Sequence, residues 1–435
     1  MKAEAKEEVG QNVDSSKQAR NVQKLWSAAR WKVLVSAACV ALVSGMLGEN
    51  VCGQQPGTQS NGEKNMNAKL TIPCNHPSFG LSPYAWKPMG SGDTARVEAI
   101  FPGAYFKTIV KGTTSAGLVI DGTANTGCPP GLMPIIEYSV DDGSFTVVPL
   151  TQAGSMYTCP LAANLDPAKE HRIEVYLRAA DWGPQRWAAS ILHLRVAGVS
   201  VDAGGSLVPF PMRSKRAIGF GDSITEGIAA EGRYDKGTHL GNNNARGAWF
   251  PIVCAALDCE YGQFGSGGQG MVNTRLAVPP LPQTWDHYDA TTSRLTNGLL
   301  LPEPDYVFCN MGTNDVLGDG TTEDDYTTAY PQWLAAVRAA CPHASIFCVV
   351  PPSGRQRAGV RAAVATRNAA GDAKVHLIDT TSVTIPLMPN NGVPPGGTQG
   401  SYDTGHPSQW GHAIFGACVA VQVQKVLATT TGAER

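Results

Sequence analysis

The stretch Ile218–Gly227, "IGFGDSITEG", places Ser223 where a short apolar run ends and a helix can begin. Gly, Asp and Ser are good turn and helix-capping residues, so the segment is compatible with a plain strand-to-helix turn. The other interpretation is a catalytic nucleophile. A serine attacks only if a second group takes its proton and nearby donors hold the oxyanion. The choice therefore depends on whether the rest of the chain supplies a base, an orienting carboxylate and those donors.

The composition is that of a globular protein, with 43% hydrophobic and 16% charged residues among 435. This length exceeds one ordinary core, so we predict two domains behind a leader. The 48 glycines and 30 prolines predict many turns, as in a β-rich part of the chain. A formal net charge of −2 with no basic stripe gives nucleic-acid binding no electrostatic support.

Residues 1–53 are predicted to be an export signal with a long polar start. The apolar run Val33–Gly48, "VLVSAACVALVSGMLG", follows two basic residues and is short for a membrane span of about 20 residues. We therefore expect a secreted or periplasmic protein, and the alternative is a membrane anchor formed by residues 33–48. Residues 54–67, "QQPGTQSNGEKNMN", have the composition of a linker.

Residues 68–205 show short alternating runs of apolar and polar residues between turn residues, without a helical stretch. Seven runs are predicted strands: Ala95–Phe101, Tyr105–Thr113, Ala116–Asp121, Ile135–Val140, Ser144–Leu150, His171–Ala179 and Ala188–Val201. This pattern predicts a β-sandwich, or jelly-roll, domain. Export would permit disulfides, and the candidate pairs are Cys128 with Cys159 and Cys254 with Cys259.

Residues 206–435 change rhythm, because continuous apolar runs alternate with helical patterns. The predicted strands include "RAIGF", Pro304–Met311, "SIFCVVP" and "KVHLIDT", and the predicted helices include Gly247–Leu257, Thr321–Cys341, "GVRAAVATRNAA" and Ser408–Leu427. Buried strands that alternate with helices predict an α/β domain with a mainly parallel sheet covered on both faces.

In sheets of this kind, functional groups gather in the loops at the carboxyl ends of the strands. His406 is a candidate general base, and Asp403 lies close enough on a turn to orient its ring. Asn314 carries a side-chain donor, and Gly268 lets its backbone N–H approach a ligand closely. Together with the N–H of Ser223, these groups provide three donors for an oxyanion. Each signal is weak alone, and the order of all four blocks at strand-to-loop junctions favours a catalytic site.

This set of blocks resembles the signature of the SGNH, or GDSL-type, hydrolase superfamily. The blocks are Gly221-Asp222-Ser223, the glycine block Phe264–Gly270, Gly312-Thr313-Asn314-Asp315 and Asp403-x-x-His406. The resemblance covers about residues 216–426 and implies a three-layer α/β/α sandwich, preceded here by the β-sandwich domain. It implies Ser223 as nucleophile, His406 as base and Asp403 as orienting carboxylate, with Ser223, Gly268 and Asn314 forming the oxyanion hole.

Two positions near these blocks need a choice. The usual Ser-Gly of the glycine block is Gly267-Gly268 here, so Gly265 or Gly267 is an alternative oxyanion donor. Asp222 is expected to stabilise the turn and not to act as a second base. His412 lies in the last predicted helix with no carboxylate nearby in sequence, and we expect it to be structural.

A jelly roll followed by an SGNH domain is similar to carbohydrate esterase family two, whose members remove acetyl groups from xylan and related plant polysaccharides. The implied function is a serine esterase acting on an acetylated carbohydrate through an acetyl-enzyme. We expect a monomer that needs no cofactor and no metal, since no His/Cys cluster has zinc spacing. Trp285, Tyr288 and Trp410 are candidates for stacking on sugar rings, with ordinary packing as the alternative for each.

Three alternatives stay open. An SGNH hydrolase can act on another ester, such as a lipid, a short acyl ester or another acetylated glycan, because specificity lies in loops. A catalytically inactive carbohydrate-binding protein is the second alternative, although it has no need of Ser, His and Asp together. Gly265-x-Gly267-x-x-Gly270 also fits a dinucleotide-binding fingerprint, but three prolines follow within residues 279–282, where a long helix should run.

Overall fold

The computed structural model describes residues 68–181, 185–188, 192–232, 240–274, 278–315, 321–387 and 405–433. The predicted leader, the linker and Asp403 lie outside the described residues, so these predictions are not examined by the structure. Lys64–Arg435 forms one compact unit. The domain boundary predicted between residues 205 and 206 stays a prediction.

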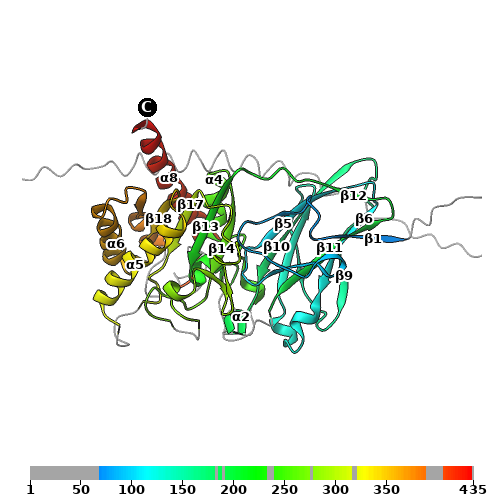
Figure 1. The fold of residues 1–435 in the computed structure, drawn as a ribbon, viewed down its shortest axis with the longest axis horizontal. Helices are drawn as coiled ribbons and strands as arrows, with labels where there is room; N and C mark the ends of the chain where they lie inside the picture. Colours follow the sequence, from blue (N-terminus) through cyan, green and yellow to red (C-terminus); the bar gives the residue numbers. More distant parts are fainter. Residues whose placement is uncertain are drawn as a thin grey trace, which may run out of the picture. The chain divides into compact units, whose positions relative to one another are not determined.

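The first half of the described chain forms two antiparallel six-stranded sheets, drawn in blue to green in Figure 1. The first sheet has the order β3-β4-β11-β6-β9, with β1 beside β11, and consists of β1 (Lys69–Pro73), β3 (Lys87–Met89), β4 (Arg96–Ala99), β6 (Ser115–Asp121), β9 (Met156–Ala163) and β11 (Leu194–Asp202). The second has the order β12-β5-β10-β7-β8, with β2 beside β5, and consists of β2 (Gly80–Leu81), β5 (Tyr105–Lys111), β7 (Ile135–Val140), β8 (Thr146–Pro149), β10 (Glu170–Ala179) and β12 (Ser206–Val208).

The two antiparallel sheets share one core, and alternation along the strands produces it. In β10, Ile173 and Val175 are fully buried. They belong to the same hydrophobic cluster as Leu118 of β6 and Val199 of β11, which lie in the other sheet. Apolar side chains at every second position point to one face of a sheet, so each sheet buries one face against the other.

The strand predicted at Ala188–Val201 is only partly correct. Its first residue ends the short helix α2 (Gln185–Ala188), and β11 begins at Leu194. The other six predicted strands coincide with β4, β5, β6, β7, β8 and β10.

The second half of the described chain forms a five-stranded sheet in the order β14-β13-β17-β18-β19, in which every pair is parallel. The strands are β13 (Lys215–Gly221), β14 (Cys259–Gly265), β17 (Tyr306–Asn310), β18 (Ser345–Val349) and β19 (Val375–Ile378), with a separate hairpin of β15 (His287–Asp289) and β16 (Thr292–Ser293). The helices are α3 (Ser223–Glu226), α4 (Trp249–Ala256), α5 (Glu323–Ala340), α6 (Arg357–Ala369), α7 (Thr381–Leu387) and α8 (Gln409–Ala433).

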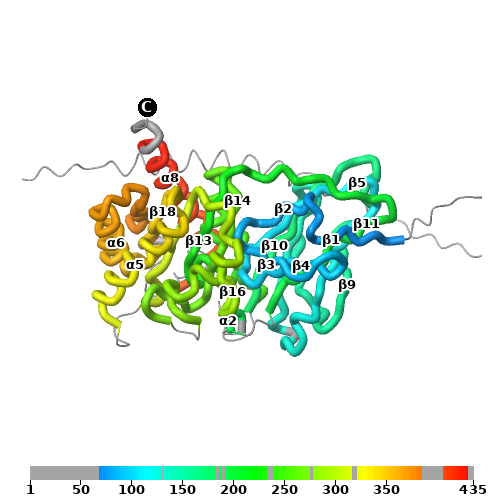
Figure 2. Tube along the Cα trace, in the orientation of Figure 1, coloured from blue at the N-terminus to red at the C-terminus, as the bar shows by residue number. Residues whose placement is uncertain are grey.

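Helices cover both faces of the parallel sheet. On β17, Val307 joins the cluster that contains α5 and α6, whereas its neighbour Phe308 joins the cluster that contains α4 and α8. Successive strand residues point to opposite faces, so these two helix pairs lie on opposite sides of the sheet. Helices α5 and α6 run side by side in the yellow and orange part of the chain (Figure 2).

The disulfides proposed from the sequence are wrong in this structure. All nine cysteines beyond Gly53 are free thiols. The Sγ of Cys128 donates to the carbonyl of Pro129, and that of Cys159 donates to the carbonyl of Pro160. The Sγ of Cys259 lies 3.5 Å from the carbonyl oxygen of Cys254, so it points to the backbone of its proposed partner.

Within the described ranges, α8 is the one helix long and apolar enough to span a membrane, with a mean hydropathy of 1.3 over Gln409–Thr429. Its composition has a second explanation in the fold. Phe415, Val419 and Val423 are fully buried, and the helix packs along α4. The Phe415 ring lies 5.3 Å from that of Trp249 in α4, measured between centroids. These contacts are those of a core helix in a globular domain.

Phe415→Ala is expected to lower the free energy of unfolding by about 3–5 kcal/mol, because it empties a fully buried aromatic site. The matched change Val421→Ala on the same helix should cost less than about 1 kcal/mol, because Val421 is 39% exposed. Urea unfolding of the two variants measures both values. Equal losses at the two positions would contradict the placement of α8 in the core.

Candidate active site

Ser223 begins helix α3 directly after strand β13 ends. Asp222 is the N-cap of this helix, and its carboxylate accepts from the backbone N–H of Ile224 at 2.9 Å. Gly227 ends the helix in the left-handed conformation with φ of 78°. The residue types that suit a plain turn are therefore used as such, and they hold Ser223 at the carboxyl end of the sheet.

The structure also explains two other residues of the motif, Gly221 and Thr225. A Cβ atom on Gly221 would lie 1.9 Å from Thr225 Oγ1, so only glycine fits at the end of β13. The hydroxyl of Thr225 in turn accepts from Trp249 Nε1 at 3.2 Å. The turn is thereby packed against α4.

The structure brings His406 to Ser223. The Nε2 atom of His406 lies 2.9 Å from Ser223 Oγ, which is hydrogen-bonding distance for a base and its nucleophile. His406 is half-buried and lies just before α8, while Ser223 is 7% exposed. Asp403 lies outside the described residues, so its role as orienting carboxylate stays a prediction.

His412 has the surroundings expected of a structural residue. It is fully buried, and burial lowers the pKa of its imidazole to about 3, with a smaller contribution from the nearby charge of His406. The side chain is therefore neutral at any pH at which an esterase works. Neither ring nitrogen of His412 has a hydrogen-bond partner among the described residues.

The glycine block forms a tight turn beside Ser223. The N–H of Gln269 donates to the carbonyl of Ser266 at 3.1 Å, and Gly268 lies between them with φ of +75°. Positive φ at the third position of such a turn favours glycine. The turn is tied to β13 because Ser266 N–H donates to Gly221 O at 3.0 Å.

The alternative oxyanion donors differ in their surroundings. The N–H of Gly267 donates to the carboxylate of Glu226 at 2.9 Å, so this donor is already used. Gly265 lies within β14 and pairs with Gly221 of β13. Gly268 is the remaining candidate, and it follows Gly265 and Gly267 in the turn.

Asn314 lies on the other side of the glycine block, after strand β17. Its Nδ2 donates to the carbonyl of Gln269 at 2.9 Å, and the side chain is 8% exposed. One of the two N–H bonds of this amide group therefore fixes the side chain against the turn. The second N–H bond is the one that an oxyanion would use.

The sequence analysis did not predict a role for two carboxylates of this site. Asp315 accepts three backbone N–H bonds, from Met271 at 2.9 Å, Val272 at 2.8 Å and Asn273 at 3.0 Å. Glu226 holds the N–H of Gly267. Both carboxylates were visible in the motifs, in "GTND" and "SITEG", but the sequence does not show which backbone groups they reach.

The three aromatic residues predicted to contact the substrate differ in their surroundings. Tyr288 is fully buried, and its hydroxyl donates to the carbonyl of Glu98 at 2.7 Å, so the prediction that it stacks on sugar is wrong. For Tyr288 the alternative of ordinary packing therefore applies. Trp285 is 6% exposed and packs edge-on against Phe220. It also lines a cavity together with Ser266 and Gln269 of the glycine block, so its role in substrate binding stays a prediction. Trp410 is half-buried in the first turn of α8, and its role stays a prediction.

The chain is similar to a known protein family and to a curated protein. A family model described as the GDSL-like Lipase/Acylhydrolase family matches residues 220–414. Among curated proteins, the chain is similar to the cellulase/esterase CelE of Acetivibrio thermocellus, with 28% identity over 205 residues. That match covers 45% of this chain and 25% of CelE, so the chain corresponds to about a quarter of that protein.

Several solved structures share the fold. A family two carbohydrate esterase from Cellvibrio japonicus matches with a TM-score of 0.66 and 17% identity, over 83% of this chain and 98% of that one. A family two esterase from Clostridium thermocellum, in complex with cellohexaose, matches with 0.64 and 20%, over 80% and 99%. The acetyl xylan esterase Est2A from Butyrivibrio proteoclasticus matches with 0.61 and 16%, over 84% and 99%.

Residues 220–414 therefore match a GDSL-like lipase/acylhydrolase domain. The solved structures add that the fold is the SGNH-type fold found in family two carbohydrate esterases.

Asp222→Asn is expected to stabilise the protein above about pH 6 and to have little effect below about pH 4. Burial raises the pKa of Asp222 from its ordinary 3.8 to about 6. The folded state thus binds this proton more tightly than the unfolded chain, so stability falls as pH rises through this range. Asparagine keeps the N-cap and removes that loss, which is on the order of 3 kcal/mol.

Urea unfolding at pH 4 and pH 8 measures this difference. A gain of the same size at both values, or a loss at pH 8, would show that burial of the Asp222 charge is not what the substitution removes.

Proposed function

We propose that this protein is a serine esterase that removes O-acetyl groups from a plant-type polysaccharide such as xylan, or from its oligosaccharides. The observation that carries the proposal is the 2.9 Å contact between His406 Nε2 and Ser223 Oγ at the carboxyl end of a parallel sheet. The glycine turn and Asn314 lie next to this pair, on the loops after the two neighbouring strands.

The proposed reaction uses these groups as follows. Ser223 Oγ attacks the acetyl carbonyl while His406 Nε2 takes its proton, and Asp403 orients the ring. The N–H groups of Ser223 and Gly268 and the amide of Asn314 hold the oxyanion of the tetrahedral intermediate. His406 then protonates the departing sugar oxygen, and water activated by the same imidazole hydrolyses the acetyl-enzyme.

The carbohydrate substrate is supported by the named similarities. CelE is described as a cellulase/esterase, one structural neighbour holds cellohexaose, and Est2A is an acetyl xylan esterase. We further propose that the protein is exported, or held at the membrane by residues 33–48, and works as a monomer without a cofactor or metal. An ester of a different kind is the second candidate, because specificity lies in loops.

The central test compares acetate release from acetylated xylan and from a small aryl acetate, with and without Ser223→Ala. Release from both, abolished in the variant, would support the esterase and its polysaccharide substrate together. Release from the aryl acetate alone would keep Ser223 as nucleophile and contradict the xylan assignment. Release from neither would favour a binding protein without catalysis.

The base is tested by comparing two histidines close in sequence. His406→Ala should lower kcat on the aryl acetate by about 10³-fold or more, because the nucleophile loses its proton acceptor. His412→Gln should change kcat by less than about tenfold, because this neutral, buried ring takes no part in proton transfer. Similar losses in both variants, with both folded by circular dichroism, would count against His406 as the base.

A further inference from the structure

Glu226 joins the nucleophile helix to the glycine turn. It is the last residue of α3 and is 1% exposed. Its Oε2 accepts from Gly267 N–H at 2.9 Å. The fit is close, since a Cβ atom on Gly265 would lie 2.3 Å from the Glu226 backbone nitrogen. The carboxylate therefore fixes the peptide immediately before the N–H of Gly268.

The other oxygen of the same carboxylate faces the first half of the described chain. This half contains the two antiparallel sheets and is called the antiparallel part below. Glu226 Oε1 lies 2.8 Å from Arg186 Nη1, in an ion pair that is almost completely buried. Arg186 is 3% exposed and belongs to α2, which lies between strands β10 and β11. Its guanidinium lies 5.8 Å from the centre of the Phe101 ring, which also belongs to the antiparallel part.

The charge of this carboxylate depends on its partner. Burial raises the pKa of Glu226, and the positive charge of Arg186 opposes the rise. An ionised carboxylate is a stronger acceptor for a backbone N–H than a neutral one. A carboxylate buried without its cation is strongly unfavourable, so loss of Arg186 disturbs the group that holds Gly267.

We propose that Arg186 is a positioning residue for the oxyanion turn and acts on it through Glu226. The inference rests on the proposed function, because it assigns the Gly268 N–H to the oxyanion. It implies that the antiparallel part contributes to turnover of any ester, including one that carries no sugar. A part that only bound glycan would leave the turnover of such an ester unchanged.

The test is Arg186→Met in the full chain, assayed with p-nitrophenyl acetate. We expect kcat to fall by about tenfold or more while KM changes less than about threefold, because the donor is displaced and not removed. The rate at which diethyl p-nitrophenyl phosphate inactivates Ser223 should fall in parallel, since its phosphoryl oxygen must occupy the oxyanion hole. The double variant Arg186→Met/Glu226→Gln should recover part of the loss, because the amide oxygen still accepts from Gly267 and needs no cation.

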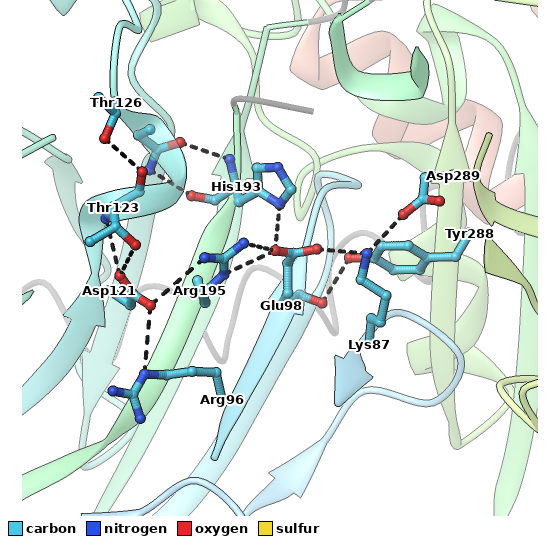
Figure 3. A network of polar contacts seen from close by, with 11 residues as sticks. Lys87, Arg96, Glu98, Asp121, Thr123, Thr126, His193, Arg195, Tyr288 and Asp289 are labelled. Atoms are coloured by element: carbon cyan, nitrogen blue, oxygen red, sulfur yellow. Dashed lines mark hydrogen bonds and ion pairs between the residues drawn. The ribbon is translucent and has the colours of Figure 1, made fainter. Parts of the chain in front are cut away.

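The matched control is Arg195→Met, which removes the same side chain from another buried glutamate. Arg195 Nη2 lies 2.6 Å from Glu98 Oε2 in the first antiparallel sheet, and Glu98 is 1% exposed (Figure 3). Glu98 also pairs with Lys87 and His193, so its ion pairs among the described residues lie in this network and not at the glycine turn. This variant should lower the melting temperature and leave kcat within about twofold.

Hydrogen–deuterium exchange gives a second readout that needs no activity. Peptides that span Ser266–Gln269 should exchange faster in Arg186→Met than in the unaltered protein, and should not change in Arg195→Met. Unchanged kcat and exchange in a folded Arg186→Met protein would overturn the proposal. Equal losses of kcat in both variants would overturn it too, as a general effect of stability. An unaltered protein that hydrolyses no ester would contradict the proposed function, and the exchange result would then judge the Arg186 contact alone.

Discussion

The register of three parallel strands determines where the nucleophile and the proposed oxyanion donors lie. Gly221 at the end of β13 pairs with Gly265 of β14 on one side and with Asn310 of β17 on the other. The loops that leave these three strands therefore start side by side. A shift by one residue in either pair would turn the loop residues to the other face and separate the nucleophile from its donors.

Around this edge the protein buries charged groups and uses each to hold backbone. Asp222 caps α3, Glu226 holds Gly267, and Asp315 holds the three N–H groups that follow the glycine turn. Burial raises the pKa of all three carboxyls, so the folded protein disfavours their charged forms relative to water. What they provide is a turn whose N–H groups are fixed before a substrate arrives, the condition for stabilising an oxyanion.

Much of the fold and of the candidate site could be predicted from the sequence, because the sequence signals are local. Strand β7 has the predicted limits Ile135–Val140, and helix α5 begins with a capping box of Thr322 and Asp325 inside the predicted helix Thr321–Cys341. Strand β9 was missed because Pro160 lies in its middle and argues against a strand. It is an edge strand that pairs only with β6, and a proline is tolerated there.

Contacts between segments that are distant in sequence could not be predicted. Nothing in the sequence brings Arg186 to Glu226, because that pair depends on how the antiparallel part packs against the glycine turn. The prediction that Tyr288 contacts a sugar failed for a related reason. Its hydroxyl donates to the buried carbonyl of Glu98, a residue distant in sequence. Local motifs thus predict which residues are reactive, and tertiary packing decides which residues position them.

The most direct test of a nucleophilic Ser223 is to trap the covalent intermediate. The protein is mixed with p-nitrophenyl acetate, quenched in acid within milliseconds and digested, and the peptides are analysed by mass spectrometry. The account predicts one acetyl group on Ser223 that disappears when the substrate is exhausted. Hydrolysis without an acetylated peptide, or an acetyl group stably placed on another residue, would contradict it.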